Sequence, residues 1–168
     1  MEQFNELYKL HFTTIYRMVS KFSVSRFEAE DIVQEVFIKL YLHYESGATV
    51  QYPKTWLYKV ASNICINTVS RRKETLHIEK VNELDLGVFD SLEMKIEEDE
   101  HGKIIHKALS TLKEQEKLIV ILYSEGLSYK EIADVSGVRF SSVSKSLSRA
   151  LEKLKPLLKN RYYEMLNQ

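Results

Sequence analysis

The stretch that decides the fold is Gly126-Leu-Ser-Tyr-Lys-Glu-Ile-Ala-Asp-Val-Ser-Gly-Val138. Ser128 and Glu131 have the spacing of a capping box, in which the two residues satisfy each other's backbone N–H groups at the start of a helix. Gly137 can take the backbone shape that a tight turn requires, and Ala133 is small where two helices cross closely. The stretch therefore predicts a helix-turn-helix.

The helix expected after this turn, from about Phe140 to Lys155, has an apolar and a basic face. The residues expected to face the core are Val143, Leu147, Ala150, Leu151 and Leu154. Between Arg139 and Arg161 there are seven basic residues and one acidic residue, and Lys, Arg and Ser side chains suit the edges and phosphates of duplex DNA. The candidate contacts are Tyr129, Lys130, Arg139, Ser141, Ser142, Ser144, Lys145, Ser148 and Arg149. A helical hairpin with a solvated basic face is the alternative, but turn, caps and charge together favour DNA binding.

Two further helices are expected upstream of the motif. The first is indicated by a short apolar stripe made of Ile104, Ile105, Ala108, Leu109 and Leu112. Thr111 and Glu114 have capping-box spacing for a second helix over 114–124, which Gly126 ends. Residues 101–168 are thus predicted to form one small helical domain.

A connector precedes this domain. Apolar periodicity weakens over 74–100, and four acidic residues stand together at 97–100. The formal charge is +3 for 1–73, −8 for 74–101 and +5 for 102–168. We therefore expect an acidic, flexible linker over 76–100 between two basic modules. The acidic run could instead begin the next helix, or cover a basic DNA-binding face in the free protein.

The first module, residues 1–75, is expected to begin with two amphipathic helices. Apolar residues recur at three- and four-residue steps over 4–22, which indicates a helix with one buried stripe. Ser25 and Glu28 then have capping-box spacing for a second helix that ends at about His43. Its buried stripe is Ala29, Ile32, Val33, Val36, Phe37 and Leu40.

The opposite face of this second helix combines carboxylates with large aliphatic side chains. Its members are Asp31, Gln34, Glu35, Ile38 and Leu42. Such a face suits a basic partner protein. An ordinary solvated face is the alternative, whereas acid-base catalysis would need the carboxylates to converge in a pocket with a nucleophile or metal.

A third helix is expected to start at Pro53, after a polar loop, and to end near Arg71-Arg72-Lys73. Trp56, Leu57, Val60, Ala61, Ile64 and Thr68 are its predicted inner stripe. The outer face is polar and basic with aromatic residues at its entrance, which is typical of a surface for single-stranded nucleic acid. The candidate contacts are Tyr52, Trp56, Lys59, Ser62, Asn63, Asn67, Ser70 and Arg71. Alternatively, Trp56 is a core residue and the basic run complements the helix dipole.

The composition excludes several classes of protein. The 168 residues include 24 Lys+Arg, 24 Asp+Glu and one Cys, so a disulfide framework is excluded and a reducing compartment such as the cytoplasm is expected. The longest apolar run, 118–123, is too short to span a membrane. The five histidines lack metal-ligand spacing and there is no glycine-rich phosphate loop. We therefore expect no catalytic residue, no metal and no cofactor.

Three motifs in this order resemble the extracytoplasmic-function (ECF) sigma factors of the sigma-70 family. Ala29-Glu-Asp-Ile-Val-Gln-Glu-Val-Phe-Ile-Lys-Leu-Tyr41 is similar to region 2.2 of that family, and Pro53-Lys-Thr-Trp-Leu-Tyr-Lys-Val-Ala-Ser-Asn63 to regions 2.3 to 2.4. Residues 126–149 are similar to region 4.2. The resemblance implies an all-α protein with two small helical domains and no enzymatic activity of its own.

The resemblance also implies partners and residue roles. The face with Asp31, Gln34 and Glu35 would dock on the β′ clamp helices of core RNA polymerase. The third helix would capture the melted −10 promoter element, the helix-turn-helix would bind the −35 element as a duplex, and an anti-sigma factor would hold the protein inactive. Where the family commonly has two cations in the last helix, this chain has Ser144 and Ser146, which implies a different −35 sequence or less salt-dependent binding.

A DNA-binding regulator is the competing hypothesis. It would use the helix-turn-helix on duplex DNA without polymerase and would dimerise through the face that contains Ile38 and Leu42. A strictly monomeric protein would count against it.

Overall fold

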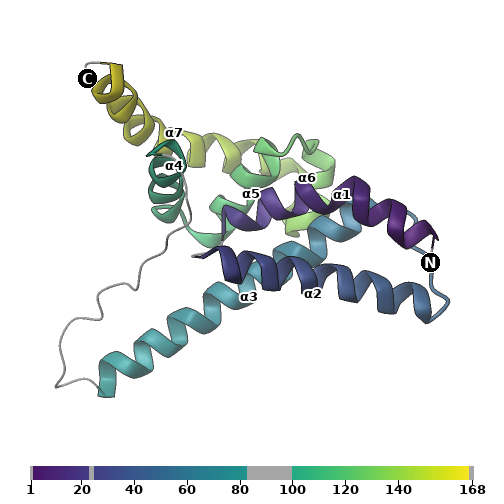
Figure 1. Cartoon of the computed structure of the whole chain (residues 1–168). Coiled ribbons are helices and arrows are strands. Elements are labelled where there is room, and N and C mark those ends of the chain that lie inside the picture. Colours follow the sequence, from purple (N-terminus) through teal and green to yellow (C-terminus); the bar gives the residue numbers. More distant parts are fainter. Residues whose placement is uncertain (1, 23–24, 83–99, 167–168) are drawn as a thin grey trace. The chain divides into compact units, whose positions relative to one another are not determined.

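The computed structural model describes residues 2–22, 25–82 and 100–166, and every regular element in these ranges is an α-helix (Figure 1). The all-α fold class predicted from the sequence is confirmed. The helices are α1 (Glu2–Ser20), α2 (Arg26–Glu45), α3 (Pro53–Asn82), α4 (Glu100–Ser110), α5 (Glu114–Ser124), α6 (Tyr129–Ser136) and α7 (Phe140–Leu166).

Contacts divide the chain into two compact units. The first unit comprises Met1–Val50 and Val60–Ile96, and the second comprises Gln51–Lys59 and Glu97–Gln168. α3 therefore begins in the second unit and continues in the first.

In the first unit, α1 and α2 lie side by side (Figure 1). All six residues of the predicted α2 stripe are buried, and Ile15, Met18 and Val19 of α1 are buried with them. Burying a large aliphatic side chain stabilises a fold by roughly 1.5–3 kcal/mol, so these stripes hold the two helices together. The packing leaves the opposite face of α2 to solvent.

The start of α2 is fixed by Ser25. Its side-chain oxygen accepts a hydrogen bond from the Glu28 backbone N–H at 3.1 Å, as a helix N-cap does. The Glu28 carboxylate pairs with the Arg72 guanidinium of α3. Glu28 thus ties α3 to α2 within the first unit.

The second unit has its core among α5, α6 and α7. The buried apolar residues include Leu118, Ile119, Ile121, Leu122, Ile132, Val135, Val143, Leu147, Ala150 and Leu154. Leu151 was expected in this core but is 42% exposed. The row formed by Val143, Leu147 and Leu154 already faces the neighbouring helices, and Leu151 lies beside that row.

The turn of the helix-turn-helix forms as predicted. The Ser128 hydroxyl accepts a hydrogen bond from the Glu131 N–H at 3.2 Å, and the Ser128 N–H donates to the Glu131 carboxylate at 2.8 Å. Gly137 ends α6 with φ of +73°, and its N–H donates to the Ala133 carbonyl at 2.9 Å. A side chain at Gly137 would be strained by this left-handed backbone conformation.

The predicted cap of α5 is wrong. Thr111 does not start this helix, because its hydroxyl donates to the Ala108 carbonyl at the end of α4, at 2.7 Å. The start is Lys113, whose backbone N–H donates to the Glu116 carboxylate at 3.2 Å. The pair at the start of α5 is thus Lys113 and Glu116, two residues further along the chain than the predicted pair of Thr111 and Glu114.

Two helices are longer than predicted. α3 continues to Asn82, so the beginning of the expected linker is helical. Residues 74–82 contain neither Gly nor Pro, so no helix-breaking residue ends α3 before this point. The rest of the predicted linker, including the acidic run at 97–99, lies outside the described residues, whereas Glu100 begins α4. α7 continues past Pro156, which has no backbone N–H to donate to the carbonyl of Glu152. Glu152 is exposed, so water can hydrogen-bond this carbonyl instead.

Candidate polymerase and nucleic-acid interfaces

The outward face of α2 is exposed along its whole length. Ile38 is 55% exposed and Leu42 is 58% exposed, and both are large apolar side chains. Asp31, Gln34 and Glu35 are also exposed on this face, as the sequence predicted. The Glu35 carboxylate lies 3.3 Å from the Lys39 amine, whereas Asp31 stands one turn nearer the start of the helix.

Phe27 belongs to this face and was missed in the sequence prediction. It is 79% exposed, the highest fraction among the exposed large apolar residues of the described chain. Phe27 lies four residues before Asp31, so that both side chains project from the same side of the helix. This four-residue spacing, which is visible in the sequence, could have placed Phe27 on the outward face of α2. We call Phe27, Asp31, Gln34, Glu35, Ile38 and Leu42 the α2 docking face.

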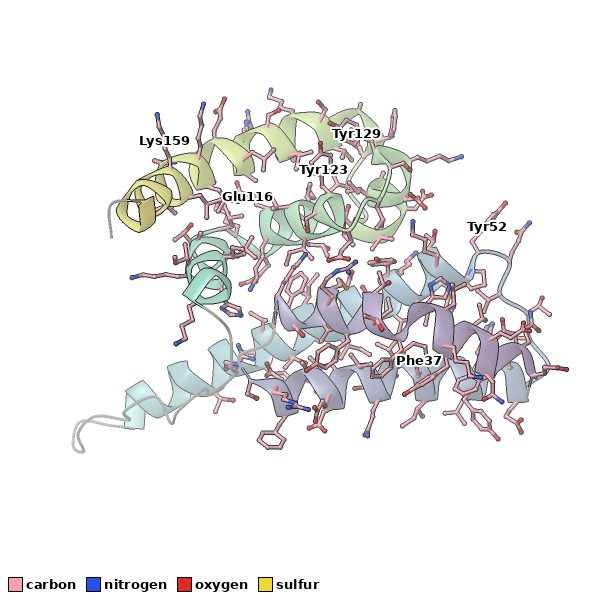
Figure 2. All side chains as sticks on the ribbon, turned by 45° about the horizontal axis from the view of Figure 1, so that its top comes forward. Phe37, Tyr52, Glu116, Tyr123, Tyr129 and Lys159 are labelled. Atoms are coloured by element: carbon pink, nitrogen blue, oxygen red, sulfur yellow. The ribbon has the colours of Figure 1, made fainter. Side chains whose placement is uncertain are left out.

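A pocket of about 270 Å³ opens between α1 and α2, beside the α2 docking face. Phe4, Tyr8 and Phe12 of α1 form one wall, and the α2 residues Val33, Gln34, Phe37, Ile38 and Tyr41 form the other. Phe37 lies on the side of α2 that faces α1 (Figure 2). The amino-acid sequence alone does not predict this pocket, because its apolar residues fit an ordinary buried stripe equally well.

Most candidate residues for the −10 element are exposed. Tyr52 is 68% exposed and stands on the loop that enters α3 (Figure 2), whereas Trp56 is half-buried. The other exposed candidates are Lys59, Asn63, Asn67, Ser70 and Arg71. Their amide, hydroxyl and cationic groups form one polar surface of α3 that can bind bases and phosphates.

Ser62 is the exception, because it is buried and does not lie on the exposed face of α3 as predicted. Its exposed fraction is 1%, and Tyr58 beside it on the helix is 1% exposed as well. The buried stripe of α3 consists of Leu57, Tyr58, Ala61, Ser62 and Cys65. Leu57 and Ala61 belong to the predicted inner stripe and are buried, whereas its other members, Trp56, Val60, Ile64 and Thr68, are half-buried. Tyr58, Ser62 and Cys65 carry a weaker apolar signal than Trp56, Val60 and Ile64, but they are buried.

The helix-turn-helix presents its predicted residues to solvent. Tyr129, Lys130, Arg139, Ser141, Ser144, Lys145, Ser148 and Arg149 are exposed. Ser142 is half-buried, and its backbone N–H donates to the Arg139 carbonyl at 2.8 Å. Phe140, at the start of α7, is 63% exposed and was missed, although a single apolar residue among polar ones directly after the turn was visible in the sequence.

An aromatic pair lies at the entry to the helix-turn-helix. Tyr123 of α5 is 46% exposed and Tyr129 of α6 is 39% exposed, with their ring centroids 6.3 Å apart (Figure 2). Tyr129 was a candidate for backbone contacts, and Tyr123 was not. The neighbouring rings give this end of α6 a partly apolar surface that complements the hydroxyl groups.

Two carboxylates of the second unit are held in their charged form. The pKa of Glu131 is lowered, first by the hydrogen bond from the Ser128 N–H that completes the cap of α6. The pKa of Glu116 is lowered chiefly by its bond with the Lys153 amine, whose nitrogen is 2.6 Å from the carboxylate oxygen. Lys153 is therefore committed to the internal structure of the unit, unlike the candidate DNA contacts earlier in α7.

In the described ranges no helix is both long enough and apolar enough to cross a membrane. No cluster of three His, Cys, Asp or Glu side chains that could hold a metal ion occurs in the same part of the chain.

Comparisons with known proteins agree with this arrangement. The Sigma-70 region 2 family matches residues 7–75, and the Sigma-70, region 4 family matches residues 102–154. The chain is 32% identical to the ECF RNA polymerase sigma-E factor of Haemophilus influenzae, over 80% of this chain and 79% of that protein. It is 28% identical to the ECF RNA polymerase sigma factor SigE of Mycolicibacterium smegmatis, over 94% of this chain and 62% of that longer protein.

The fold is also similar to a solved sigma factor. RpoE of Bartonella quintana, in complex with the anti-sigma factor NepR, superposes with a TM-score of 0.71 at 21% identity, over 95% of this chain and 98% of that chain. The chain therefore belongs to the sigma-70 family, in its extracytoplasmic-function group, whose members direct RNA polymerase to promoters and initiate transcription.

Proposed function

We propose that this chain binds core RNA polymerase through the α2 docking face and recognises promoters through two separate DNA surfaces. The exposed side of α3 binds the melted −10 element as a single strand. The surface of α6 and α7 that carries Lys145 and Arg149 binds the −35 element as a duplex. Region 2 thus occupies roughly residues 1–75, and region 4 residues 101–168.

The single observation that carries the proposal is the α2 docking face. Large apolar side chains gathered on an exposed helix face, with carboxylates between them, are typical of an interface with another protein. The carboxylates Asp31 and Glu35 fit a basic partner surface, and Ile38 and Leu42 supply apolar area that becomes buried on binding. We take this partner surface to be the β′ clamp helices of the polymerase.

The two DNA surfaces differ in chemistry, which supports different substrates. The α3 surface offers amides, Tyr52 and the half-buried Trp56, and such aromatic groups can stack on unpaired bases. The surface of α7 offers cations and hydroxyls on one helix behind a tight turn, which suits the major groove of a duplex. Neither surface requires a catalytic step by this chain, and we place the protein in the cytoplasm with the polymerase.

An anti-sigma factor is part of the proposal. The solved sigma factor RpoE was obtained with its anti-sigma factor NepR bound, and CnrH, another solved relative, with the cytosolic domain of CnrY. We propose that this chain is held inactive by a protein of that kind until transcription is required.

The decisive experiment is co-elution of the purified chain with bacterial core RNA polymerase on a sizing column. The native chain should bind, and the double variant Asp31→Arg with Glu35→Arg should not. The matched control is Glu2→Arg with Glu6→Arg, since these exposed carboxylates are also four residues apart but lie on α1. Circular dichroism should show that all three proteins are equally helical.

Unchanged binding by the Asp31 and Glu35 variant would overturn the assignment of the α2 docking face. If the native chain binds duplex DNA but no polymerase, and sediments as a dimer, the regulator hypothesis replaces the proposal.

A further inference from the structure

Phe140 places an exposed aromatic ring at the first position of α7. Its exposed fraction of 63% exceeds that of every other large apolar residue described in α4 to α7. The backbone around it is fixed, because the Ser142 N–H donates to the Arg139 carbonyl at 2.8 Å and the Val138 N–H donates to the Ser136 hydroxyl at 3.3 Å. A single exposed apolar side chain is common on protein surfaces, but this one stands at the start of a recognition helix, where such helices contact bases.

The exposed residues in the first turns of α7 form two neighbouring rows at four-residue steps. One row is uncharged and consists of Phe140, Ser144 and Ser148. The other row is basic and consists of Ser141, Lys145 and Arg149. The surface of the helix is therefore apolar and hydroxylic along one side and cationic along the other, with the ring at the end nearest the turn.

The chemistry of the major groove decides which base suits the ring. Phenylalanine has no hydrogen-bonding group, so a ring placed against a guanine oxygen or a cytosine amine would leave that polar group without a partner. The C5-methyl group of thymine is the apolar group that the bases present in this groove. The exposed cations Arg139 and Lys145 on either side of the ring favour a polyanion over a basic protein as the neighbour of Phe140.

We infer that Phe140 is a specificity-determining residue that contacts the C5-methyl group of a thymine in the −35 element. The inference rests on the proposed function, since it takes the surface of α6 and α7 as the one that binds duplex DNA. The ring contacts a base and no phosphate, so it sets which sequence is bound but leaves the salt dependence of binding unchanged.

The test removes the methyl group from the DNA and the ring from the protein. Promoter fragments with a randomised −35 region are first selected with the holoenzyme formed from core polymerase and the full chain. Deoxyuridine, which lacks the C5-methyl group, then replaces each enriched thymine in turn. At one position it should raise the Kd of the native holoenzyme about fourfold, as expected for the loss of one buried methyl group. The same replacement should change the Kd of the Phe140→Ser holoenzyme less than about 1.5-fold.

Two further variants serve as controls. Leu157→Ser removes another exposed apolar side chain from α7, more than four helical turns beyond Phe140, and should keep the native response to deoxyuridine. Phe140→Leu retains an apolar side chain and should keep part of that response. All variants should be as helical as the native chain by circular dichroism, and Phe140→Ser should show the native salt dependence.

Equal responses of the native and Phe140→Ser holoenzymes to deoxyuridine at every enriched thymine would overturn the inference, and so would a selected −35 sequence without thymine. If Phe140→Ser loses core polymerase in the absence of DNA and keeps the native base preference, the ring is a protein contact and the inference fails. A native holoenzyme that selects no −35 sequence at all would instead contradict the proposed function, and the inference with it.

Discussion

Ser62 is a buried serine whose hydroxyl has no hydrogen-bond partner in the described part of the chain. A buried hydroxyl without a partner has lost its water without compensation, so removing it costs little. We expect Ser62→Ala to leave the free energy of unfolding unchanged or to raise it by up to about 1 kcal/mol, and to leave promoter opening unchanged. Urea unfolding and the fluorescence of 2-aminopurine placed in the −10 element check the two expectations.

Asn63, the residue after Ser62, is expected to affect promoter opening but not stability. Asn63 is exposed on α3, so Asn63→Ala should change the free energy of unfolding by less than about 0.5 kcal/mol. It should nevertheless slow promoter opening by roughly fivefold if its amide binds a base, which corresponds to one hydrogen bond of about 1 kcal/mol. An opening defect in Ser62→Ala that equals that of Asn63→Ala would contradict the burial assignment.

Arg71 and Arg72 are adjacent in sequence but have different surroundings. The Arg72 side chain is 31% exposed and pairs with Glu28, whose side chain is 20% exposed, whereas Arg71 is exposed on the proposed −10 surface of α3. Arg72→Ala should destabilise the first unit by about 1 kcal/mol, seen as faster hydrogen exchange in the first turns of α2. Arg71→Ala should leave exchange unchanged and reduce the salt dependence of DNA binding by about one phosphate contact. The reverse pattern would mean that the roles are exchanged.

At the scale of the helices, the boundaries that a capping residue marks were predicted better than those without one. Ser25 and Ser128 start helices and Gly137 ends one, each through local backbone hydrogen bonds that depend on neighbouring residues alone. The ends of α3 and α7 carry no such signal. α7 passes Pro156 and α3 passes the weakly periodic residues 74–82, because a helix needs only good helix-forming residues and hydrated carbonyls to continue.

The buried and exposed faces of the helices were also predicted well for one helix and poorly for another. The buried stripe of α2 could be read from its strong aliphatic period, and so could the outward face around Asp31 and Ile38. The stripe of α3 was predicted only in part: Leu57 and Ala61 are buried as expected, whereas Tyr58 and Ser62 carry hydroxyl groups and are buried by packing that periodicity alone does not reveal. The pocket beside α2 depends on the relative placement of rings from two helices, and no single-helix pattern contains that information.

The cap of α6 makes the stability of the second unit pH-dependent. The pKa of Glu131 is lowered in the folded chain, so the unfolded chain takes up a proton at higher pH than the folded chain does. The contribution of the charged carboxylate is therefore fully present above its ordinary value of 4.5 and is lost as the pH falls through the lowered value. Glu131→Gln should flatten the decline of unfolding free energy below pH 4.5, measured by urea unfolding at several pH values. Glu152→Gln, an exposed position in α7, is the control, and an equal effect of the two changes would contradict the role of the cap.

Phe27 tests how far the α2 docking face extends toward the start of the helix. An apolar ring that is 79% exposed contributes little to folding, so Phe27→Ser should leave the free energy of unfolding within about 0.5 kcal/mol of the native value. It should weaken binding to core polymerase by about tenfold, because a large ring at an interface buries substantial apolar area. Leu10→Ser, also a highly exposed apolar position in the first unit, is the control. Titration of labelled polymerase gives both values, and equal affinities would exclude Phe27 from the interface.

At the scale of the whole molecule, a formal net charge of zero conceals opposite local charges. Residues 102–168 carry +5 and residues 74–101 carry −8. The acidic docking face belongs to the first unit and the basic helix-turn-helix to the second, and each unit has its own buried core. Because the two interfaces share no core residue, their free energies of binding are expected to add.

This separation predicts a double dissociation. Lys145→Ala with Arg149→Ala should abolish binding to a −35 duplex and reduce its salt dependence by roughly two phosphate contacts, while polymerase binding without DNA stays unchanged. Asp31→Arg with Glu35→Arg should abolish polymerase binding and leave duplex binding intact. The control for the cations is Lys103→Ala with Lys107→Ala, an exposed pair at the same spacing on α4. Duplex affinity across a salt series and polymerase co-elution measure the two activities. A loss of polymerase binding in the Lys145 and Arg149 variant, in the absence of DNA, would mean that polymerase also holds the basic face and that the two units do not act separately.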